Sequence, residues 1–185
     1  MKTIITIFII IISFLFSDAT AFVLCEGNYS SSNASLWTIS GGTISEAPGN
    51  PVGDTGQSLT VHENRLYLIN NGSSTIEVYH IEDGYLSFLI SISTNYSGPR
   101  EMIIHNGLGY ITEWYTSQIA ILNLETFEFV GEINIDGMPE DIISDGVFLY
   151  ASITMKADWS SSDKIVKINP VTNTIEEIFT VGMGP

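Results

Sequence analysis

Four short apolar runs follow one another over residues 57–92: QSLTVH (57–62), LYLI (66–69), TIEVY (75–79) and LSFLISI (86–92). The same succession returns as REMIIH (100–105), GYIT (109–112), QIAIL (118–122) and FEFVGEI (127–133), and again as EDIISD (140–145), LYAS (149–152), KIVKI (164–168) and TIEEIF (174–179). Tyrosine holds the same place in every copy, at positions 67, 110 and 150. A repeat of ~40–45 residues with four strand-length runs per copy indicates the blades of a β-propeller.

The runs themselves read as strands rather than helices. Each is rich in Ile, Val, Leu, Tyr and Phe, and clusters of Asn, Asp, Gly and Ser separate one run from the next. We therefore predict an all-β fold of four-stranded antiparallel blades, with whole blades at residues 57–99, 100–139 and 140–185. The unbroken apolar runs 102–104 and 142–143 predict that the first strand of each blade, nearest the axis, is covered on both faces.

The segment before residue 57 reads as an incomplete blade. FVLCEG (22–27) aligns with YLINNG (67–72), which is a second strand, and residues 34–39 and 43–47 then supply the third and fourth strands. The partial blade at 22–56 is thus expected to lack its inner strand. Closed propellers often complete such a blade with a strand from the other end of the chain. We expect about four blades here, forming an N-terminal fragment of a larger ring.

The first 21 residues are expected to be a secretory signal peptide. Lys2 precedes an apolar run of 13 residues at 4–16, and Ala19 and Ala21 place small side chains where a signal peptidase cuts. As a helix this run would span ~20 Å, short of the ~30 Å hydrocarbon core of a bilayer, which disfavours a retained membrane anchor. The mature chain is then exported, to the periplasm, the cell surface or the medium. Cys25 lies near the cleavage site, but the bulky Leu24 before it does not fit lipid attachment.

The composition excludes several classes of partner. The chain has 6 Lys and Arg against 21 Asp and Glu, a formal net charge of −15. A surface this acidic repels nucleic-acid phosphates and anionic lipids, so neither nucleic acid nor membrane insertion of the mature chain is expected. With 44% hydrophobic and only 15% charged residues the chain is globular rather than disordered.

The repeat resembles that of the YVTN-repeat propellers, also called YncE-like or surface-layer propellers. The signature stands here as LYLINNGSSTIEVY (66–79) and GYITEW (109–114), and LCEGNY (24–29) with NASL (33–36) is similar to the start of a secreted branch from Bacteroidetes-type bacteria. The resemblance covers residues 22–185. It implies an exported binding or scaffolding protein without assigned catalysis. Some surface members of the family capture corrinoid vitamins for an outer-membrane transporter.

Candidate ligand-binding residues gather at one end of the predicted propeller. The connections between blades meet the loops between second and third strands around the axis there, and we name this the mouth end. The connections supply Gln57, Arg100 and Glu140, while the loops supply Asn70, Asn71, Glu113, Trp114, Tyr115, Lys156 and Trp159. Aromatic, amide and charged side chains of both signs are what ligand sites combine. The alternative is that these are solvated loops with aromatic side chains packed between blades.

Residues at the other end, named the far end, do not predict a metal site. His62 and His105 end the first strands of successive blades, and because blades splay outward, one ion is not expected to reach both. The loop DWSSSD (158–163) has oxygen-bearing side chains but lacks the calcium-binding spacing of an EF-hand. Glu101 and Asp141 open adjacent inner strands, where we expect hydrogen bonds to neighbouring strands rather than a catalytic pair. No metal or cofactor is predicted.

Two functional hypotheses remain. The first is a non-enzymatic exported propeller that captures a small molecule or a cell-surface protein at the mouth end. The second is a propeller enzyme, either a metal-dependent lactonase or a quinone-cofactor dehydrogenase, in which Glu140, Asn70 and Trp114 are the residues available as ligands or as a stacking surface. The sequence motifs specify the fold more sharply than the activity, and they favour the first hypothesis.

Overall fold

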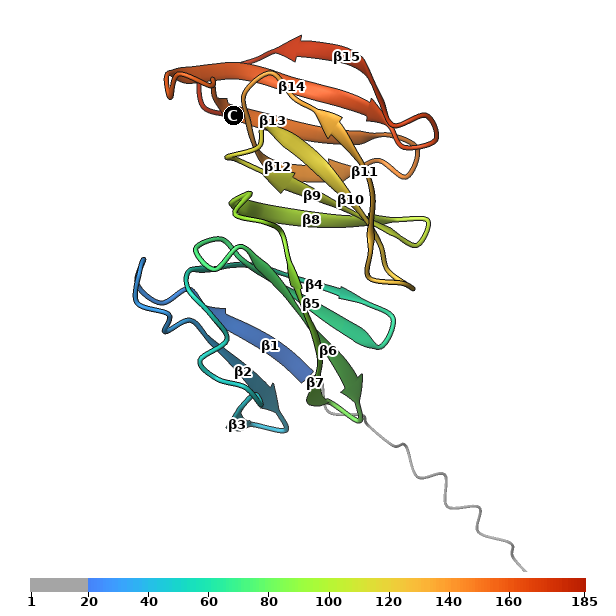
Figure 1. Cartoon of the computed structure of the whole chain (residues 1–185). Coiled ribbons are helices and arrows are strands. Elements are labelled where there is room, and N and C mark those ends of the chain that lie inside the picture. The colour runs from blue at the N-terminus through green and yellow to red at the C-terminus, as the bar shows by residue number, and fades with distance from the viewer. Residues whose placement is uncertain (1–19) are drawn as a thin grey trace, which may run out of the picture.

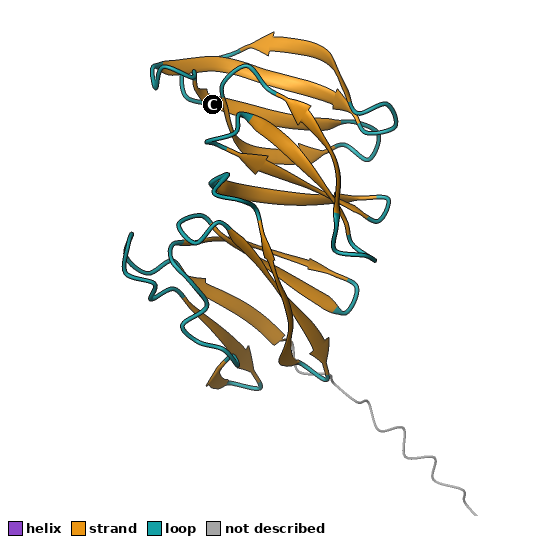
Figure 2. Ribbon diagram, in the orientation of Figure 1, coloured by secondary structure: helices purple, strands orange, loops and turns teal. Residues whose placement is uncertain are grey.

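The computed structural model describes residues 20–185. The predicted signal peptide covers residues 1–21, of which 1–19 lie outside the described residues. From Thr20 onward the regular structure consists of 15 β-strands (Figure 1), and this part of the chain contains no helix with the length and apolar character needed to cross a bilayer. Figure 2 shows the loops that join the strands, of which residues 26–34 and 47–55 form the longest.

The strands form four antiparallel sheets, each built from consecutive strands. The first sheet has three strands: β1 (Thr20–Cys25), β2 (Ser35–Ser40) and β3 (Thr43–Glu46). The second contains β4 (Gly56–His62), β5 (Arg65–Asn70), β6 (Thr75–Glu82) and β7 (Tyr85–Ser93). The third contains β8 (Pro99–His105), β9 (Leu108–Glu113), β10 (Gln118–Asn123) and β11 (Phe129–Asn134). The fourth contains β12 (Met138–Ser144), β13 (Leu149–Met155), β14 (Ser161–Asn169) and β15 (Thr174–Thr180).

The sheets stack in sequence order, as Figure 1 shows, in the manner of propeller blades. The first strands of successive four-stranded sheets lie side by side, β4 beside β8 and β8 beside β12. Strand β1 packs against β4 in the same way that β5 packs against β8 and β9 against β12. Strand β1 therefore occupies a second-strand position, and within residues 20–185 the first blade has no inner strand, as predicted.

Three hydrophobic cores hold the stack together, one at each junction between sheets. Strand β5 contributes to two of them because its side chains alternate between faces: Leu66 and Leu68 pack toward the first sheet, and Tyr67 and Ile69 toward the third. All four side chains are fully buried. Burying apolar area of this kind on both faces of a strand is the main stabilising term for the stack.

The expectation that the first strands are covered on both faces is wrong. Ile103 and Ile104 of β8 are half-buried, and Ile143 of β12 is 60% exposed. Strands β5 and β9, one place farther from the axis, are the ones buried almost throughout. Strands β8 and β12 lie at the edges of their sheets, whereas β5 and β9 each have a strand on both sides and a packed sheet on both faces.

An irregularity shared by two inner strands positions the residues of the mouth end. In β8 the pairing register with β9 skips Arg100 and Glu101, and in β12 the register with β13 skips Glu140 and Asp141. In β4 the register skips Gln57 alone. A β-bulge of this kind bends its strand and redirects the side chains that it carries.

Candidate functional site

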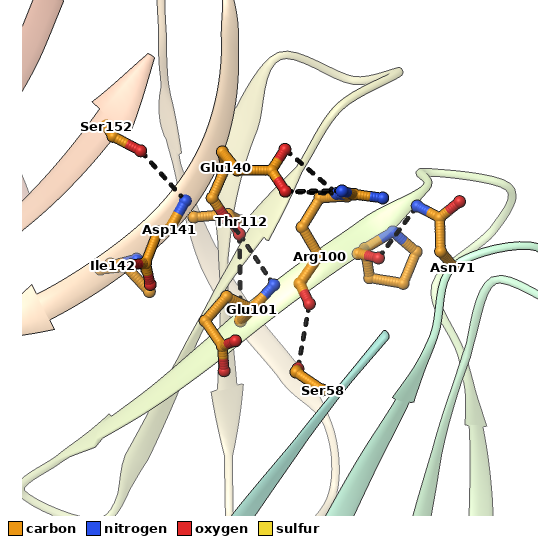
Figure 3. A network of polar contacts seen from close by, with 10 residues as sticks. Ser58, Asn71, Arg100, Glu101, Thr112, Glu140, Asp141, Ile142 and Ser152 are labelled. Atoms are coloured by element: carbon orange, nitrogen blue, oxygen red, sulfur yellow. Dashed lines mark hydrogen bonds and ion pairs between the residues drawn. The ribbon is translucent and has the colours of Figure 1, made fainter. Parts of the chain in front are cut away.

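An ion pair joins the third and fourth sheets at the mouth end. The Arg100 guanidinium donates from Nη2 to Glu140 Oε1 at 2.5 Å and from Nε to Oε1 and Oε2 at 3.1 and 3.2 Å (Figure 3). Only 18% of the Arg100 side chain and 26% of the Glu140 side chain are exposed. A fork of this geometry, partly shielded from water, is stronger and more specific than a surface ion pair.

Two tryptophans extend this ion pair across the same junction. The Arg100 guanidinium carbon lies 4.2 Å from the centroid of the Trp114 ring, a cation–π arrangement. Trp114 follows β9, and its ring meets Trp159, from the β13–β14 loop, edge to face with centroids 6.2 Å apart. We name Arg100, Glu140, Trp114 and Trp159 the tryptophan cluster. The ion pair and the tryptophan pair each join the third blade to the fourth, while the Arg100–Trp114 contact lies within the third blade.

The two indoles of the tryptophan cluster differ in their surroundings. The Trp114 Nε1 atom is buried and has no hydrogen-bond partner among residues 20–185. The Trp159 side chain is 57% exposed, on a loop closed by hydrogen bonds from the Trp159 amide to the Lys156 carbonyl and from the Lys156 amide to the Ser160 carbonyl. A buried indole donor without an acceptor costs stability, and a solvated indole face beside it is available for contact.

Hydroxyl groups hold the bulged strands in place beneath the tryptophan cluster. Ser58 of β4 donates to the Arg100 carbonyl at 3.0 Å, and Thr112 of β9 donates to the Glu140 carbonyl at 2.8 Å (Figure 3). Thr112 also accepts the amide proton of Glu101. Sequence reasoning did not identify Ser58 or Thr112. The available signal was a hydroxyl two residues after the repeated tyrosine, at Thr112 and Ser152, where the Ser152 hydroxyl likewise accepts the amide proton of Asp141.

Glu101 and Asp141 hydrogen bond to neighbouring strands, as expected, through their backbone amides, which donate to Thr112 and Ser152. Their carboxylates also accept from the next residue of their own strand. Glu101 Oε1 accepts the Met102 amide proton at 3.0 Å, and Asp141 Oδ1 accepts the Ile142 amide proton at 2.8 Å. Burial raises the pKa of Glu101, and the charge of Asp141 adds a smaller effect in the same direction. These two residues support the bulges.

Glu113 lies apart from the tryptophan cluster. Its side chain is 2% exposed and accepts hydrogen bonds from Thr116 at 2.9 Å and Gln118 at 2.7 Å. It lines a cavity of about 220 Å³ together with Thr94 and Asn95 of the second sheet's exit loop. Burial raises the pKa of Glu113, because the apolar surroundings disfavour its charged form.

The predicted amide residues have structural roles. Asn70 is fully buried and donates to the Val52 carbonyl at 2.7 Å, toward the first sheet. Asn71 donates to the Pro99 carbonyl at 3.1 Å, directly before Arg100 (Figure 3). Gln57 is half-buried at the bulge of β4. Of these three residues, only Asn71 hydrogen bonds to β8, the strand that carries Arg100 of the tryptophan cluster.

Tyr115 and Lys156 are exposed at the mouth end. The Tyr115 side chain is 54% exposed, and its ring lies close to Gly98. Gly98 has a φ of +63°, and a Cβ atom there would come within 2.8 Å of the ring, so glycine is required both for the turn and for the aromatic contact. Within residues 20–185, no group of three or more His, Cys, Asp or Glu side chains is arranged to hold a metal ion.

Comparisons with solved structures identify the fold. The chain is similar to hydrazine synthase of Kuenenia stuttgartiensis (18% identity, TM-score 0.67), covering 80% of this chain and 43% of that one. It is similar to the designed protein Ika8 (10% identity, TM-score 0.65, 83% and 45% covered). It is also similar to a Bacteroides fragilis protein provisionally assigned as a 6-phosphogluconolactonase (17% identity, TM-score 0.64, 93% and 57% covered).

The predicted fold class is confirmed: the chain is all-β, with four-stranded antiparallel blades and one blade of three strands, and it corresponds to part of larger propeller structures. It spans between 43% and 57% of the length of the three structures named. No family model and no curated protein matches the sequence. At these identities the likeness shows the fold alone.

Proposed function

We propose that the chain is an exported, non-enzymatic β-propeller protein that captures a small molecule or a cell-surface partner at its mouth end. The observation that carries this proposal is the tryptophan cluster, in which an ion pair and an aromatic pair cross the same blade junction and leave the Trp159 face in solvent. Rigidly supported aromatic side chains beside solvent are characteristic of binding sites.

The chemistry of the mouth end favours a flat ligand or an aromatic group of a partner. Trp159 and Tyr115 offer exposed aromatic rings, and the exposed Lys156, in the same loop as Trp159, adds a positive charge. The ion pair uses the charge of Arg100, so the guanidinium orients Trp114 rather than binding an anion. The resemblance to YVTN-repeat propellers supports the same reading, since some of its members bind corrinoids, which are large and nearly planar.

Cyanocobalamin binding followed by tryptophan fluorescence tests this proposal. Replacing Trp159 with Ala should weaken binding roughly thirtyfold, as for an interface hot spot. The stability of the variant should stay within about 0.5 kcal/mol of the wild type, because the side chain is exposed. Trp37, which lies in β2 of the first sheet and donates from its indole to Ser35, provides a matched control. Trp37→Phe should bind normally, and equal binding by wild type and Trp159→Ala contradicts the proposal.

A propeller enzyme is the competing proposal, and a different measurement separates the two. Both Glu140 oxygens accept from Arg100, and the Asn70 amide is bound to a backbone carbonyl, so these residues support structure as they stand. Metal analysis of the purified protein, paired with a lactone-hydrolysis assay, is the test. One tightly held divalent ion per chain, with hydrolysis that depends on it, would favour the enzyme.

A further inference from the structure

A second hollow lies at the far end, between the second and third sheets. Its volume is about 440 Å³, which is within the ~300–1,000 Å³ typical of small-ligand sites. Residues of the β4–β5, β8–β9 and β10–β11 turns line it, and we name it the far-end groove. Glu63, Asn64, Asn106 and Glu125 line it with polar groups, Leu108 and Leu124 add apolar surface, and Tyr67 forms part of its lining.

Tyr67 supplies a second, independent sign of a ligand. Its side chain is fully buried, yet its hydroxyl has no hydrogen-bond partner within the described part of the chain. Tyr110, at the same place in the next blade, is equally buried, but its hydroxyl lies 3.2 Å from the Pro170 carbonyl and 3.1 Å from Asn173 Oδ1. A buried hydroxyl that lacks a partner costs free energy, so the difference at Tyr67 needs a reason.

The Tyr67 hydroxyl differs from that of Tyr110 because other residues stand where the Tyr110 partners do. Residues 118–127 align with 164–173, so that Leu124 stands where Pro170 does and Phe127 where Asn173 does. The alignment is supported by matching turns, in which Asn123 and Asn169 each accept the amide proton two residues on. Arg65 donates to the Leu124 carbonyl at 2.5 Å, and Phe127 offers no polar group. Neither counterpart pairs with Tyr67 in the way that Pro170 and Asn173 pair with Tyr110.

The charges around the far-end groove indicate the class of ligand. The guanidinium of Arg65 is engaged, with one nitrogen on the Leu124 carbonyl and its carbon 5.0 Å from the Phe127 ring centroid. The carboxylates of Glu63 and Glu125 repel anions. Asn64 and Asn106 carry amides that both donate and accept, and such a mixture suits an uncharged ligand with several hydroxyl groups. The leucine side chains suit the apolar face of a sugar ring.

We propose that the far-end groove binds a neutral saccharide, one hydroxyl of which pairs with the Tyr67 hydroxyl. This site is separate from the tryptophan cluster and does not depend on the function proposed for the mouth end. The sugar would accept the hydrogen bond that Tyr110, in its own blade, donates to the Pro170 carbonyl or to Asn173 Oδ1.

Saturation-transfer NMR with the purified protein tests this site. The probes are glucose, galactose, mannose and N-acetylglucosamine with their disaccharides, and galacturonic acid as the anionic comparison, each at millimolar concentration. At least one neutral sugar should bind, and Tyr67→Phe should weaken it roughly tenfold through the loss of one buried hydrogen bond. Asn64→Ala, which changes an exposed turn residue, should weaken it without affecting folding.

Tyr110→Phe is the matched control, since it removes an equally buried hydroxyl outside the groove and should bind as the wild type does. Absence of binding by every neutral sugar, preference for galacturonic acid, or equal affinity in wild type and Tyr67→Phe overturns the proposal. A crystal structure soaked with the bound sugar, showing it away from Tyr67, would overturn it as well.

Discussion

The second–third and third–fourth sheet junctions have the same apolar architecture but different polar ends. Tyr67 and Tyr110 occupy matching places in the two cores, and both are fully buried. At the far end the Tyr110 hydroxyl is paired, while that of Tyr67 is not. Toward the mouth end, Ile153 packs in the third–fourth core, whereas the matching residue Glu113 places a carboxyl at the second–third junction.

This difference teaches that the stack and its sites are determined separately. Apolar side chains on alternating strand positions fix how blades pack, and they do so equally well at both junctions. A few polar positions at the ends of the strands then determine whether a junction is closed by the protein itself or left with groups that a ligand can satisfy. At the far end, the second–third junction is the open one.

The second–third and third–fourth cores should contribute equally to the free energy of unfolding. Substitutions at two adjacent residues of β10 test this and should have the largest effect. Ile121 packs in the third–fourth core and Leu122 in the second–third core, and both are at most 1% exposed. Ile121→Ala and Leu122→Ala should each cost about 2–5 kcal/mol in urea unfolding. A cost below about 1 kcal/mol for either variant would show that its junction is not packed as described.

Removing the hydroxyl of Tyr67 or of Tyr110 should change the free energy of unfolding differently at the two junctions. Tyr110→Phe leaves the Pro170 carbonyl and Asn173 without their partner and should cost about 1–3 kcal/mol. Tyr67→Phe removes an unpaired hydroxyl and should leave the free energy of unfolding unchanged or raised. Thermal and urea unfolding of the two variants under the same conditions measure this difference. Equal losses of stability in the two variants would contradict it.

Replacing Phe127 with Asn should give the Tyr67 hydroxyl a hydrogen-bond partner within the protein. Phe127 has a φ of +59° and Asn173 a φ of +54°, a left-handed conformation that suits asparagine and disfavours phenylalanine. The new amide should pair with Tyr67, giving a coupling of about 0.5–1.5 kcal/mol in a double-mutant cycle with Tyr67→Phe. Zero coupling would mean that residue 127 does not reach the hydroxyl.

Glu113 should make the open junction sensitive to pH. Burial raises its pKa above 4.5 in the folded state, so the fold favours the protonated carboxyl. Its contribution to stability is therefore full below the unfolded pKa and is lost as the pH rises through the folded pKa. Glu113→Gln should match the wild type at low pH and exceed its stability at neutral pH, and parallel pH profiles for the two proteins would contradict this.

The fold was predictable because its signal is repeated. Three copies of the same four-run pattern, each with a tyrosine in the second run, indicated the strands, their order and the missing inner strand of the first blade. What the pattern did not reveal was which strand is buried on both faces. Apolar runs such as 102–104 read as fully buried, but burial there depends on distance from the axis, which a single strand's composition does not encode.

The candidate site was predictable only in part. Their places in loops and blade connections predicted that Arg100, Glu140, Trp114 and Trp159 all lie at the mouth end. In the structure these four side chains are linked by contacts. The same reasoning also selected Asn70 and Glu113, which face different junctions, because the direction of a side chain depends on local register. The bulges at Arg100 and Glu140 had no clear signal in the sequence. Of the hydroxyls that hold them, Thr112 was marked only by its place two residues after the repeated tyrosine, and Ser58 had no such mark.

A crystal structure of the unliganded protein, at a resolution that shows ordered water, tests the central distinction between the junctions most directly. We predict that the Tyr110 hydroxyl lies within hydrogen-bonding distance of Asn173 and the Pro170 carbonyl. The Tyr67 hydroxyl should have no hydrogen-bond partner from the protein. A protein atom paired with the Tyr67 hydroxyl would contradict the account.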